Sequence, residues 1–420
     1  MEKKPVTAVI LGAGHRATIY GDVSLSRPDK LKIVAVADPS EERRSLAAAR
    51  YNIPSSRVFS DLESLVAAGR LADAVINGTM DAQHVPTSLP LLALGYDMLL
   101  EKPFATSPRE LAALYVAACG KGCRVFVCHV LRYSSFYLGI RRALAEGAIG
   151  KIITINMAED ISYPHMVVSY VRGMWNNETT GTPLLLAKSC HDIDLMLWLM
   201  GDNPPRTVYS LGGDYVFDAD KAPADAGSRC LLDCPREKEC PYSARKHYLL
   251  RKNCHDFYIW PRPGMTEAEK EASLRKDNPY GRCVWKCGHQ GVDHQSVTIG
   301  FADGALGVFT LTGGAPRDER RIQIVGTEGS ITGVFEENRF VIRRHDETKV
   351  YMEKTVEENI SAYDKHGGGD EALVLDFCDY LLGEKPSLSC SELSDSLNGH
   401  LAIFAAEKSR RTGKVVSLGL

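Results

Sequence analysis

The feature that most constrains the fold of this chain is a glycine turn close to its start. An apolar run, Val6–Leu11, leads directly into the segment GAGHRA at residues 12–17, which has the pattern G-x-G-x-x-A. In this pattern Gly12 allows a tight turn, Gly14 lets the backbone approach a pyrophosphate, and Ala17 lets the following helix pack closely on the strand. The N-terminus of that helix attracts phosphate oxygens. The segment therefore predicts a dinucleotide-binding unit made of a strand, a turn and a helix.

An acidic residue follows the turn at the expected spacing. A second apolar run, Leu31–Ala37, ends in Asp38, and an acid about 20 residues after such a turn accepts hydrogen bonds from the adenosine ribose. This position favours NAD over NADP. Arg43 and Arg44 follow closely, so NADP remains the less favoured alternative.

The rest of the first 130 residues alternates short apolar runs with helical patterns. Further runs lie at 74–77, 96–100 and 124–129, and helical stretches at 41–51 and 108–119. Strands that alternate with helices at this spacing predict a parallel sheet covered on both faces. We expect residues 1–130 to form a Rossmann domain with a doubly wound parallel sheet.

The pattern changes in the remainder, residues 131–420. Residues 151–157, 295–301, 306–311, 321–325 and 339–343 alternate like half-buried strands, and Asp303-Gly304 and Glu328-Gly329 mark turns. This predicts an α/β domain with a large, open and mostly antiparallel sheet. The helical patterns at 370–382 and 391–411 are expected to pack back on the protein.

Charge and hydropathy exclude several classes of function. The chain has 420 residues and a formal net charge of −3, so it has no broad basic field that would attract nucleic acid or an anionic membrane. Its first apolar run is too short for a signal peptide, and no apolar stretch is long enough to span a bilayer. These observations predict a cytoplasmic protein with reduced thiols.

Two groups of polar residues have the chemistry of a catalytic site. Lys102, in the Glu101-Lys102-Pro103 turn, ends a strand where ligands of parallel sheets bind, and an ammonium there stabilises charge on a substrate oxygen. The sequence is equally consistent with a Lys102 that simply faces solvent at the end of a strand. Lys188, His191 and Asp194 are spaced three apart and would share one helix face. Burial of such a stripe of polar side chains costs free energy unless they form ion pairs or serve a function.

Within this stripe His191 is the natural general base, because its ordinary pKa lies near neutral pH. Lys188 would lower that pKa or bind a substrate hydroxyl. An ion-pair network would also explain such a stripe.

The segments GAGHR at 12–16, EKP at 101–103 and HDID at 191–194 resemble the glucose–fructose oxidoreductase / inositol dehydrogenase / MocA family over nearly the whole chain. The resemblance implies a Rossmann domain followed by an α/β domain whose open sheet often serves oligomerisation, here as a dimer or tetramer. It also implies an NAD(P) cofactor and a cyclic sugar or polyol substrate. Lys102 would be the lysine of the Glu-Lys-Pro turn, and His191 the catalytic histidine.

One position departs from the family pattern. Many members carry an Asp four residues before the histidine, whereas this chain has Ala187 there and Lys188 next to it. A subgroup with a similar Lys-Ser-Cys-His-Asp run also shares the segment 172–175, the cysteine-rich insertion and the glycine cluster after His366. The missing Asp separates this chain from ordinary polyol dehydrogenases.

The expected site extends beyond the catalytic residues. We expect the cofactor to contact Gly12, Gly14, His15, Arg16, Asp38, Thr79, His84, Glu101 and Lys102. We expect the substrate to contact Tyr163, His165, Arg172, Trp175, Asp194 and His366. For His366, a capped glycine-rich entry to a helix explains the sequence equally well.

The leading hypothesis is NAD-dependent oxidation or reduction of a sugar or polyol hydroxyl by hydride transfer. A second hypothesis is a redox-assisted glycosidase or lyase that holds NAD and oxidises C3 transiently. It needs a further acid or base, for which Tyr163, His165 and Tyr170 are candidates, although aromatic packing would also explain them. A third is a non-enzymatic sensor that binds a nucleotide and a partner protein.

Residues 218–290 fit neither domain pattern and contain six of the twelve cysteines. A loop of this length should have its own small fold or a metal staple, and clustered thiols in a reduced compartment favour metal. The expected zinc ligands are Cys230, Cys234, Cys240 and Cys283, with Cys287 as the main substitute and His255 and His289 as further candidates. An iron–sulfur cluster would use similar ligands, and ordinary reduced cysteines are the alternative.

Overall fold

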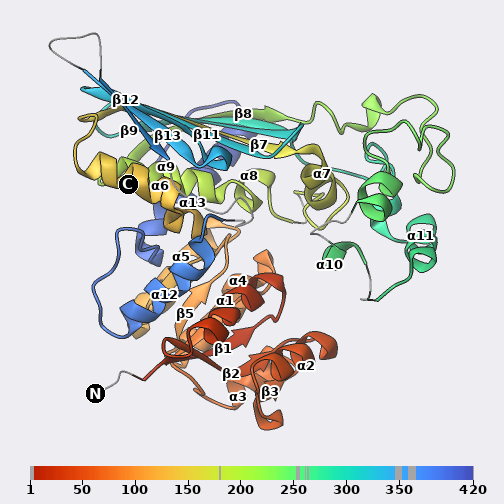
Figure 1. The fold of residues 1–420 in the computed structure, drawn as a ribbon, viewed down its shortest axis with the longest axis horizontal. Coiled ribbons are helices and arrows are strands. Elements are labelled where there is room, and N and C mark those ends of the chain that lie inside the picture. The colour runs from red at the N-terminus through yellow and green to blue at the C-terminus, as the bar shows by residue number, and fades with distance from the viewer. Residues whose placement is uncertain are drawn as a thin grey trace.

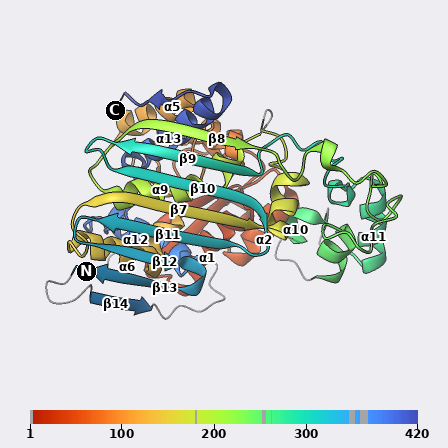
Figure 2. The ribbon, with the colours of Figure 1, turned by 90° about the horizontal axis from the view of Figure 1, so that it is seen from above.

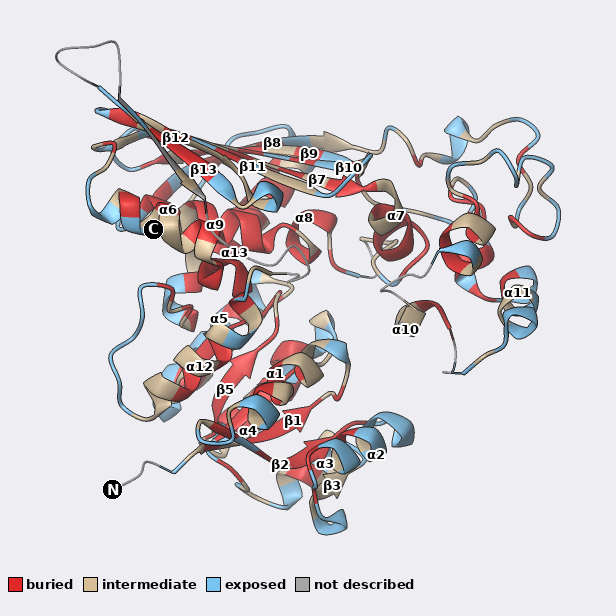
Figure 3. Cartoon of the chain, viewed as in Figure 1, coloured by how far each residue is buried: buried red, intermediate tan, exposed pale blue. Residues whose placement is uncertain are grey.

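Two sheets organise the protein, and Figure 1 shows them one above the other with helices between them. The structure is a computed structural model and describes residues 4–178, 181–251, 256–260, 262, 264–345, 352–357 and 366–419. In Figure 3 the buried residues concentrate in the strands of the lower sheet and in the helices beneath the upper one. The molecule therefore has a separate apolar core around each sheet.

The first sheet is the predicted Rossmann sheet. Its six strands are paired in parallel in the order β3-β2-β1-β4-β5-β6. They are β1 Val6–Leu11, β2 Leu31–Ala37, β3 Val58–Phe59, β4 Ala74–Asn77, β5 Asp97–Leu100 and β6 Val125–Val127. All residues of β4 and β5 are buried, because helices cover both faces of the sheet. The strand order reverses between β1 and β4, and such a switch point opens a crevice at the carboxyl ends of the strands.

Helices cover both faces of this sheet, and polar side chains cap the first turns of three of them. The helices are α1 His15–Ser26, α2 Glu41–Arg50, α3 Leu62–Ala67, α4 His84–Ala93 and α5 Pro108–Lys121. The side chains of Ser40, Asp61 and Ser107 accept backbone N–H groups in the first turns of α2, α3 and α5. A helix from the end of the chain, α12 Gly369–Leu381, adds Leu373 and Phe377 to the same core.

The second sheet is large and mostly antiparallel, as predicted. Its order is β14-β13-β12-β11-β7-β10-β9-β8-β15, and only the pair β7 and β10 is parallel among the described strands. The strands are β7 Ile152–Ser162, β8 Pro205–Gly213, β9 His294–Phe301, β10 Leu306–Ala315, β11 Glu319–Gly326, β12 Gly329–Val334, β13 Arg339–Arg344, β14 Met352–Glu357 and β15 Val416–Ser417. Buried residues alternate along β9, which indicates a sheet with one covered face.

Helices cover one face of this sheet. They are α6 Ser135–Ala145, α7 Tyr163–Met166, α8 Leu184–Ala187, α9 Cys190–Met200 and α13 Leu393–Thr412. Figure 1 shows α6, α8, α9 and α13 between the two sheets, and Figure 2 looks onto the opposite face, over which no described helix lies. Among the described helices, none combines the length and the apolar character needed to cross a bilayer.

The segment between β8 and β9 extends to one side of the large sheet (Figures 1 and 2). It contains α10 Asp256–Ile259 and α11 Glu267–Lys276, the latter begun by a capping box between Thr266 and Glu269. Its apolar core is formed by Val168, Cys230, Leu231, Ala244, Tyr248, Ile259, Trp260, Leu274 and Tyr280. The described residues of the insertion therefore pack around a small apolar core, to which Val168 from outside the insertion also contributes.

Candidate active site

The glycine turn has the geometry that a pyrophosphate requires. Gly12 has a φ of +78°, and a Cβ there would lie 2.9 Å from the carbonyl oxygen of Gly78, so a larger residue does not fit. At Gly14, by contrast, a Cβ would meet no atom within 4 Å. Gly14 is also the N-cap residue of α1 and provides no side chain to cap it. The helix N-terminus therefore has room for a phosphate beside its N–H groups, and the residues fit a dinucleotide.

Asp38 is buried beneath this turn. Its Oδ2 accepts the N–H of Ala13 at 2.8 Å, and its Oδ1 accepts the N–H of Ser40 at 2.7 Å. The guanidinium of Arg43 forms an ion pair with the same carboxylate at 3.0 Å. Asp38 thus holds the turn in shape, and Arg43 lies directly beside the position where an adenosine ribose would bind.

Arg16 links the first turn of α1 to the end of β5 and to α12. Its Nε lies 2.9 Å from Oε1 of Glu101, and its Nη2 lies 2.5 Å from Oδ1 of Asp370. Tyr20 donates to the same Glu101 oxygen at 2.6 Å, and His366 Nδ1 lies 2.8 Å from Oδ2 of Asp370. This network places His366 at the cofactor turn, although the two are far apart in the sequence.

Lys102 extends from the end of β5 to the second domain. Its Nζ donates to the carbonyl oxygen of Ala187 at 2.8 Å, the last residue of α8. The Lys102-Pro103 bond is cis, and the carbonyl of Pro103 contacts Nδ1 of His84 at 2.7 Å. His84 Nε2 in turn contacts the carbonyl of Thr79 at 2.9 Å. Thr79 and His84 therefore support the turn that presents Lys102.

His191, in the first turn of α9, is buried close to Lys102. Burial, and then the neighbouring Lys102 ammonium, lower the pKa of His191 well below the ordinary histidine value. Its Nδ1 is buried and has no hydrogen-bond partner among the described residues, which marks a place where an external group would complete the bonding. The ring of His129 packs edge-on against the ring of His191, with 5.8 Å between the ring centroids. A neutral imidazole beside an ammonium is an arrangement that moves a proton from a hydroxyl.

The prediction that Lys188, His191 and Asp194 share one helix face was wrong for Lys188, whereas His191 and Asp194 both lie on α9 and both approach His129. Lys188 lies between α8 and α9, where the helix is interrupted, and its Nζ pairs with Glu159 of β7 at 2.9 Å. Asp194 pairs with Arg132. The apolar spacing did predict α9, but it could not show the break before Cys190.

Lys188 belongs to a charged cluster on the covered face of the large sheet. Arg320 of β11 lies 2.6 Å from Glu159 and 2.9 Å from Asp192. Burial acts to raise the pKa of Glu159, but Arg320 and Lys188 outweigh it and lower that pKa to about 2. Burial raises the pKa of Asp192 above its ordinary value. Sequence reasoning missed Glu159 and Arg320, because strand alternation alone does not show which polar residues face helices.

The aromatic segment after β7 lies at the side of this cluster. His165 Nδ1 lies 3.2 Å from Oδ1 of Asp318, and burial, followed by the charge on Lys188, lowers the pKa of His165. The ring of Tyr170 packs between His165 and Trp175. Trp175 Nε1 donates to Asp81, just beyond β4, at 2.9 Å, so Trp175 spans the two domains.

Two predicted substrate residues lie elsewhere. Tyr163 packs against Tyr242 and His247 of the insertion. Arg172 is buried in the insertion, where it donates to the carbonyls of Arg282 at 2.7 Å and Tyr242 at 2.9 Å. The structure therefore does not bring Arg172 to Lys102 and His191.

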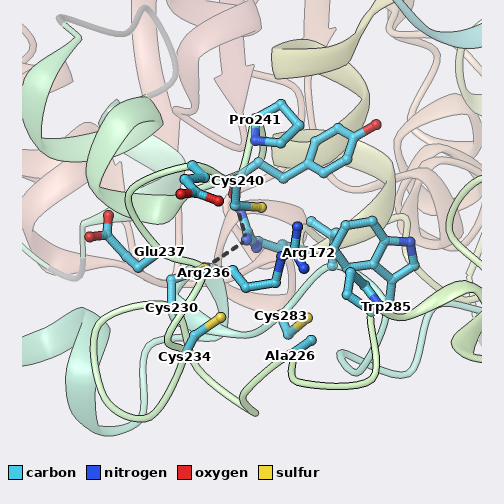
Figure 4. Close-up of a pocket in the computed structure, with 14 residues that line it drawn as sticks. Arg172, Ala226, Cys230, Cys234, Arg236, Glu237, Cys240, Pro241, Cys283 and Trp285 are labelled. Carbon is cyan, nitrogen blue, oxygen red and sulfur yellow. Dashed lines mark hydrogen bonds between the residues drawn. The ribbon is translucent and has the colours of Figure 1, made fainter.

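The zinc prediction is not supported. Within the described residues, no three His, Cys, Asp or Glu side chains lie together as the ligands of one metal ion. Cys287 instead donates to the carbonyls of Val171 and Val284, each at 3.2 Å. His255 lies outside the described residues. Cys230, Cys234, Cys240 and Cys283 line a single cavity in the insertion (Figure 4).

Comparisons with known proteins identify the two domains. Residues 6–129 match the model of an oxidoreductase family's NAD-binding Rossmann fold, and residues 141–418 match the model of its C-terminal alpha/beta domain. A putative oxidoreductase, YteT of Bacillus subtilis, is 25% identical over 80% of this chain and 78% of its own length. Inositol 2-dehydrogenase 4 of Saccharopolyspora erythraea is 27% identical over 47% of this chain and 53% of its own length.

Solved structures share the fold over the full length. Levoglucosan dehydrogenase, determined with NADH and levoglucosan, has a TM-score of 0.72 at 17% identity and covers 99% of this chain and 100% of its own. An oxidoreductase from Agrobacterium radiobacter, determined with NAD+, L-tartaric acid and magnesium, has a TM-score of 0.70 at 15% identity, with 99% of both chains covered. At these identities the likeness shows the fold.

Proposed function

Because this chain belongs to the glucose–fructose oxidoreductase / inositol dehydrogenase / MocA oxidoreductase family, we propose that it transfers a hydride between a carbohydrate hydroxyl carbon and NAD. The observation that carries the proposal is the approach of Lys102 to His191. Lys102 comes from the Rossmann sheet and bonds Ala187, four residues before His191. Sugar and polyol dehydrogenases among the relatives support a carbohydrate substrate.

The residues divide the chemistry between them. A bound nicotinamide supplies the hydride acceptor or donor. His191, which its surroundings keep neutral, takes the proton of the substrate hydroxyl, and the Lys102 ammonium donates a hydrogen bond to the same oxygen. Lys188 is paired with Glu159, and we propose that it contacts a neighbouring hydroxyl. In the reverse direction His191 returns the proton to the carbonyl oxygen.

The preference for NAD follows from Asp38. A carboxylate accepts the ribose hydroxyls and repels a 2′-phosphate. The ion pair with Arg43 reduces this repulsion, so the preference is expected to be moderate.

The redox-assisted glycosidase remains a second hypothesis, because a further titratable ring lies near the site. His165 is within electrostatic reach of Lys188 and is held by Asp318. In a glycosidase it would serve as the further base that this mechanism needs, and NAD would be regenerated in every cycle.

One experiment separates these hypotheses. The purified protein is assayed for bound nucleotide and then mixed with NAD and a panel of cyclic polyols, free sugars and aryl glycosides. Accumulation of NADH with a polyol or sugar, abolished in His191→Asn and retained in His294→Asn on the exposed end of β9, supports the dehydrogenase. Aglycone release without net NADH would support the glycosidase and overturn the proposal. Nucleotide binding without any turnover would favour the sensor.

A further inference from the structure

Three cationic side chains gather around the candidate active site and outnumber the carboxyl groups that they face. Lys188 and Arg320 both pair with the carboxylate of Glu159, at 2.9 Å and 2.6 Å. Arg320 also lies 2.9 Å from Asp192. Lys102 has no carboxylate within ion-pair distance of its Nζ in the described part of the chain. Two carboxyl groups therefore face three positive charges.

One of these carboxyl groups is held in its neutral form. Asp192 is almost fully buried, and no hydrogen-bond donor among the described residues reaches its Oδ2. An ionised oxygen buried without a donor is unfavourable. Burial raises the pKa of Asp192 well above the ordinary aspartate value, and the charge of Glu159 raises it further. Asp192 therefore carries a proton. Glu159 stays ionised, because Arg320 and Lys188 outweigh the effect of burial on its pKa.

The cluster therefore sets three positive charges against one negative charge. The other acids near the site do not remove this surplus. Glu101 is paired with Arg16 of the cofactor turn. Asp318 and Glu336 are exposed, so solvent and salt screen their charges. A buried cation without a counter-charge is unfavourable, and an anionic ligand would therefore stabilise the site.

Lys188 is the cation best placed to bind such a ligand. It follows Ala187, whose carbonyl oxygen Lys102 binds at 2.8 Å, so it lies next to the position of the reacting oxygen. Its side chain is 15% exposed, whereas that of Glu159 behind it is 1% exposed. An ammonium has three donors, and Glu159 takes one of them at 2.9 Å. This leaves donors for the neighbouring hydroxyl of the proposed function and for an anionic group beside that hydroxyl.

We propose that the substrate is a sugar acid, such as a hexuronate, whose carboxylate binds to Lys188. This inference rests on the proposed hydride transfer and names the class of substrate for it. The carboxylate would offset part of the surplus charge and accept from Lys188, while Lys102 donates to the reacting oxygen. A neutral sugar has a hydroxymethyl group in place of the carboxylate and lacks this attraction. The site would therefore select sugar acids over neutral sugars with the same ring.

The test compares sugars that differ only in this group. With the full chain and NAD, D-glucuronate is assayed against D-glucose, and D-galacturonate against D-galactose. We expect kcat/KM to be about 10–100-fold higher for the acid, the range for a hydrogen bond to a charged group. Lys188→Gln should bring this ratio close to one, and Lys188→Arg should retain most of it. Lys151→Gln, which removes an exposed charge from the same domain, is the matched control and should keep the ratio. An equal or higher kcat/KM for the neutral sugars in the wild type overturns the inference.

A binding measurement separates failure of this inference from failure of the proposed function. Protein loaded with NADH is titrated in a calorimeter with D-glucuronate, D-galacturonate and glucose 6-phosphate. Binding of an acid that Lys188→Gln loses, without any turnover, would uphold the sugar-acid site and overturn hydride transfer. Absence of binding by either acid overturns the inference, whether or not neutral sugars turn over, and tighter binding of the phosphate overturns the choice of a carboxylate.

If Lys188→Gln does not fold, the wild-type protein decides. Added salt should lower kcat/KM for the acids and leave kcat/KM for the neutral sugars unchanged, because salt screens the attraction between the carboxylate and the surplus charge. The same salt dependence for both kinds of sugar would contradict the assigned role of Lys188.

Discussion

The guanidinium of Arg132 binds both carboxylate oxygens of Asp194, with Nε 2.7 Å from Oδ2 and Nη2 2.6 Å from Oδ1. Both side chains are almost fully buried. His191, on the preceding turn of the same helix, instead faces Lys102. The helix α9 therefore has a structural acid and a candidate base only three residues apart.

This ion pair predicts a large loss of stability in Asp194→Asn. Removal of one partner leaves a buried charge unpaired and should cost about 3–5 kcal/mol of unfolding free energy. The matched control is Asp379→Asn, whose partner Lys30 lies at a more exposed position, and it should cost less than about 1 kcal/mol. Denaturant unfolding measures both. If Asp194→Asn raised only the Michaelis constant, Asp194 would instead contact the substrate.

Lys102→Met should lower kcat much more than it lowers nucleotide affinity. The ammonium stabilises charge on the reacting oxygen, and loss of such a donor costs about 10²–10³ in rate. Lys32→Met, at an exposed position of β2, is the control. The measurements are steady-state rates and nucleotide titration. Unchanged kcat in Lys102→Met would mean that the lysine only links the domains through Ala187.

The sequence predicted the first sheet well, because periodicity and turn chemistry act locally. The strands β1, β2 and β4 were predicted with the bounds that the structure shows. The short edge strand β3 was missed, since its two residues carry no pattern. In the second sheet, alternation revealed β9 and β10 but not the parallel pairing of β10 with β7, which depends on a connection through the whole insertion.

The site was harder to predict, because its partners come from distant segments. Lys102 and His191 could be named from turn and helix context. Glu159 and Arg320 gave no local signal, although they decide where Lys188 points. Arg172 and Trp175 belong to one segment and were both expected to contact the substrate, yet their side chains bond to different parts of the protein.

Asp38→Ser should shift the cofactor preference toward NADP. The change removes the carboxylate that repels a 2′-phosphate and leaves Arg43 without its partner. We expect the ratio of kcat/KM for NADP to that for NAD to rise by about 10–100-fold, which corresponds to about 1.4–2.8 kcal/mol. Asp38 also holds Ala13, so both cofactors should bind more weakly, and the ratio is the quantity to compare. A constant ratio would show that Asp38 only supports the turn.

His400 in α13 predicts a specific dependence of stability on pH. The centroid of its ring lies 3.7 Å from that of Phe104. Burial lowers the pKa of His400 well below the ordinary histidine value of 6.5. The unfolded chain therefore binds a proton below pH 6.5 that the folded chain does not, so this contribution to stability is lost as the pH falls. Between about pH 7.5 and about pH 5.5 the wild type should lose about 1.4 kcal/mol more than His400→Gln. Because the two chains share their carboxylates, the difference between their unfolding free energies cancels the titration of those groups. An equal loss of stability in both chains between the two pH values would show that His400 is protonated in the folded protein.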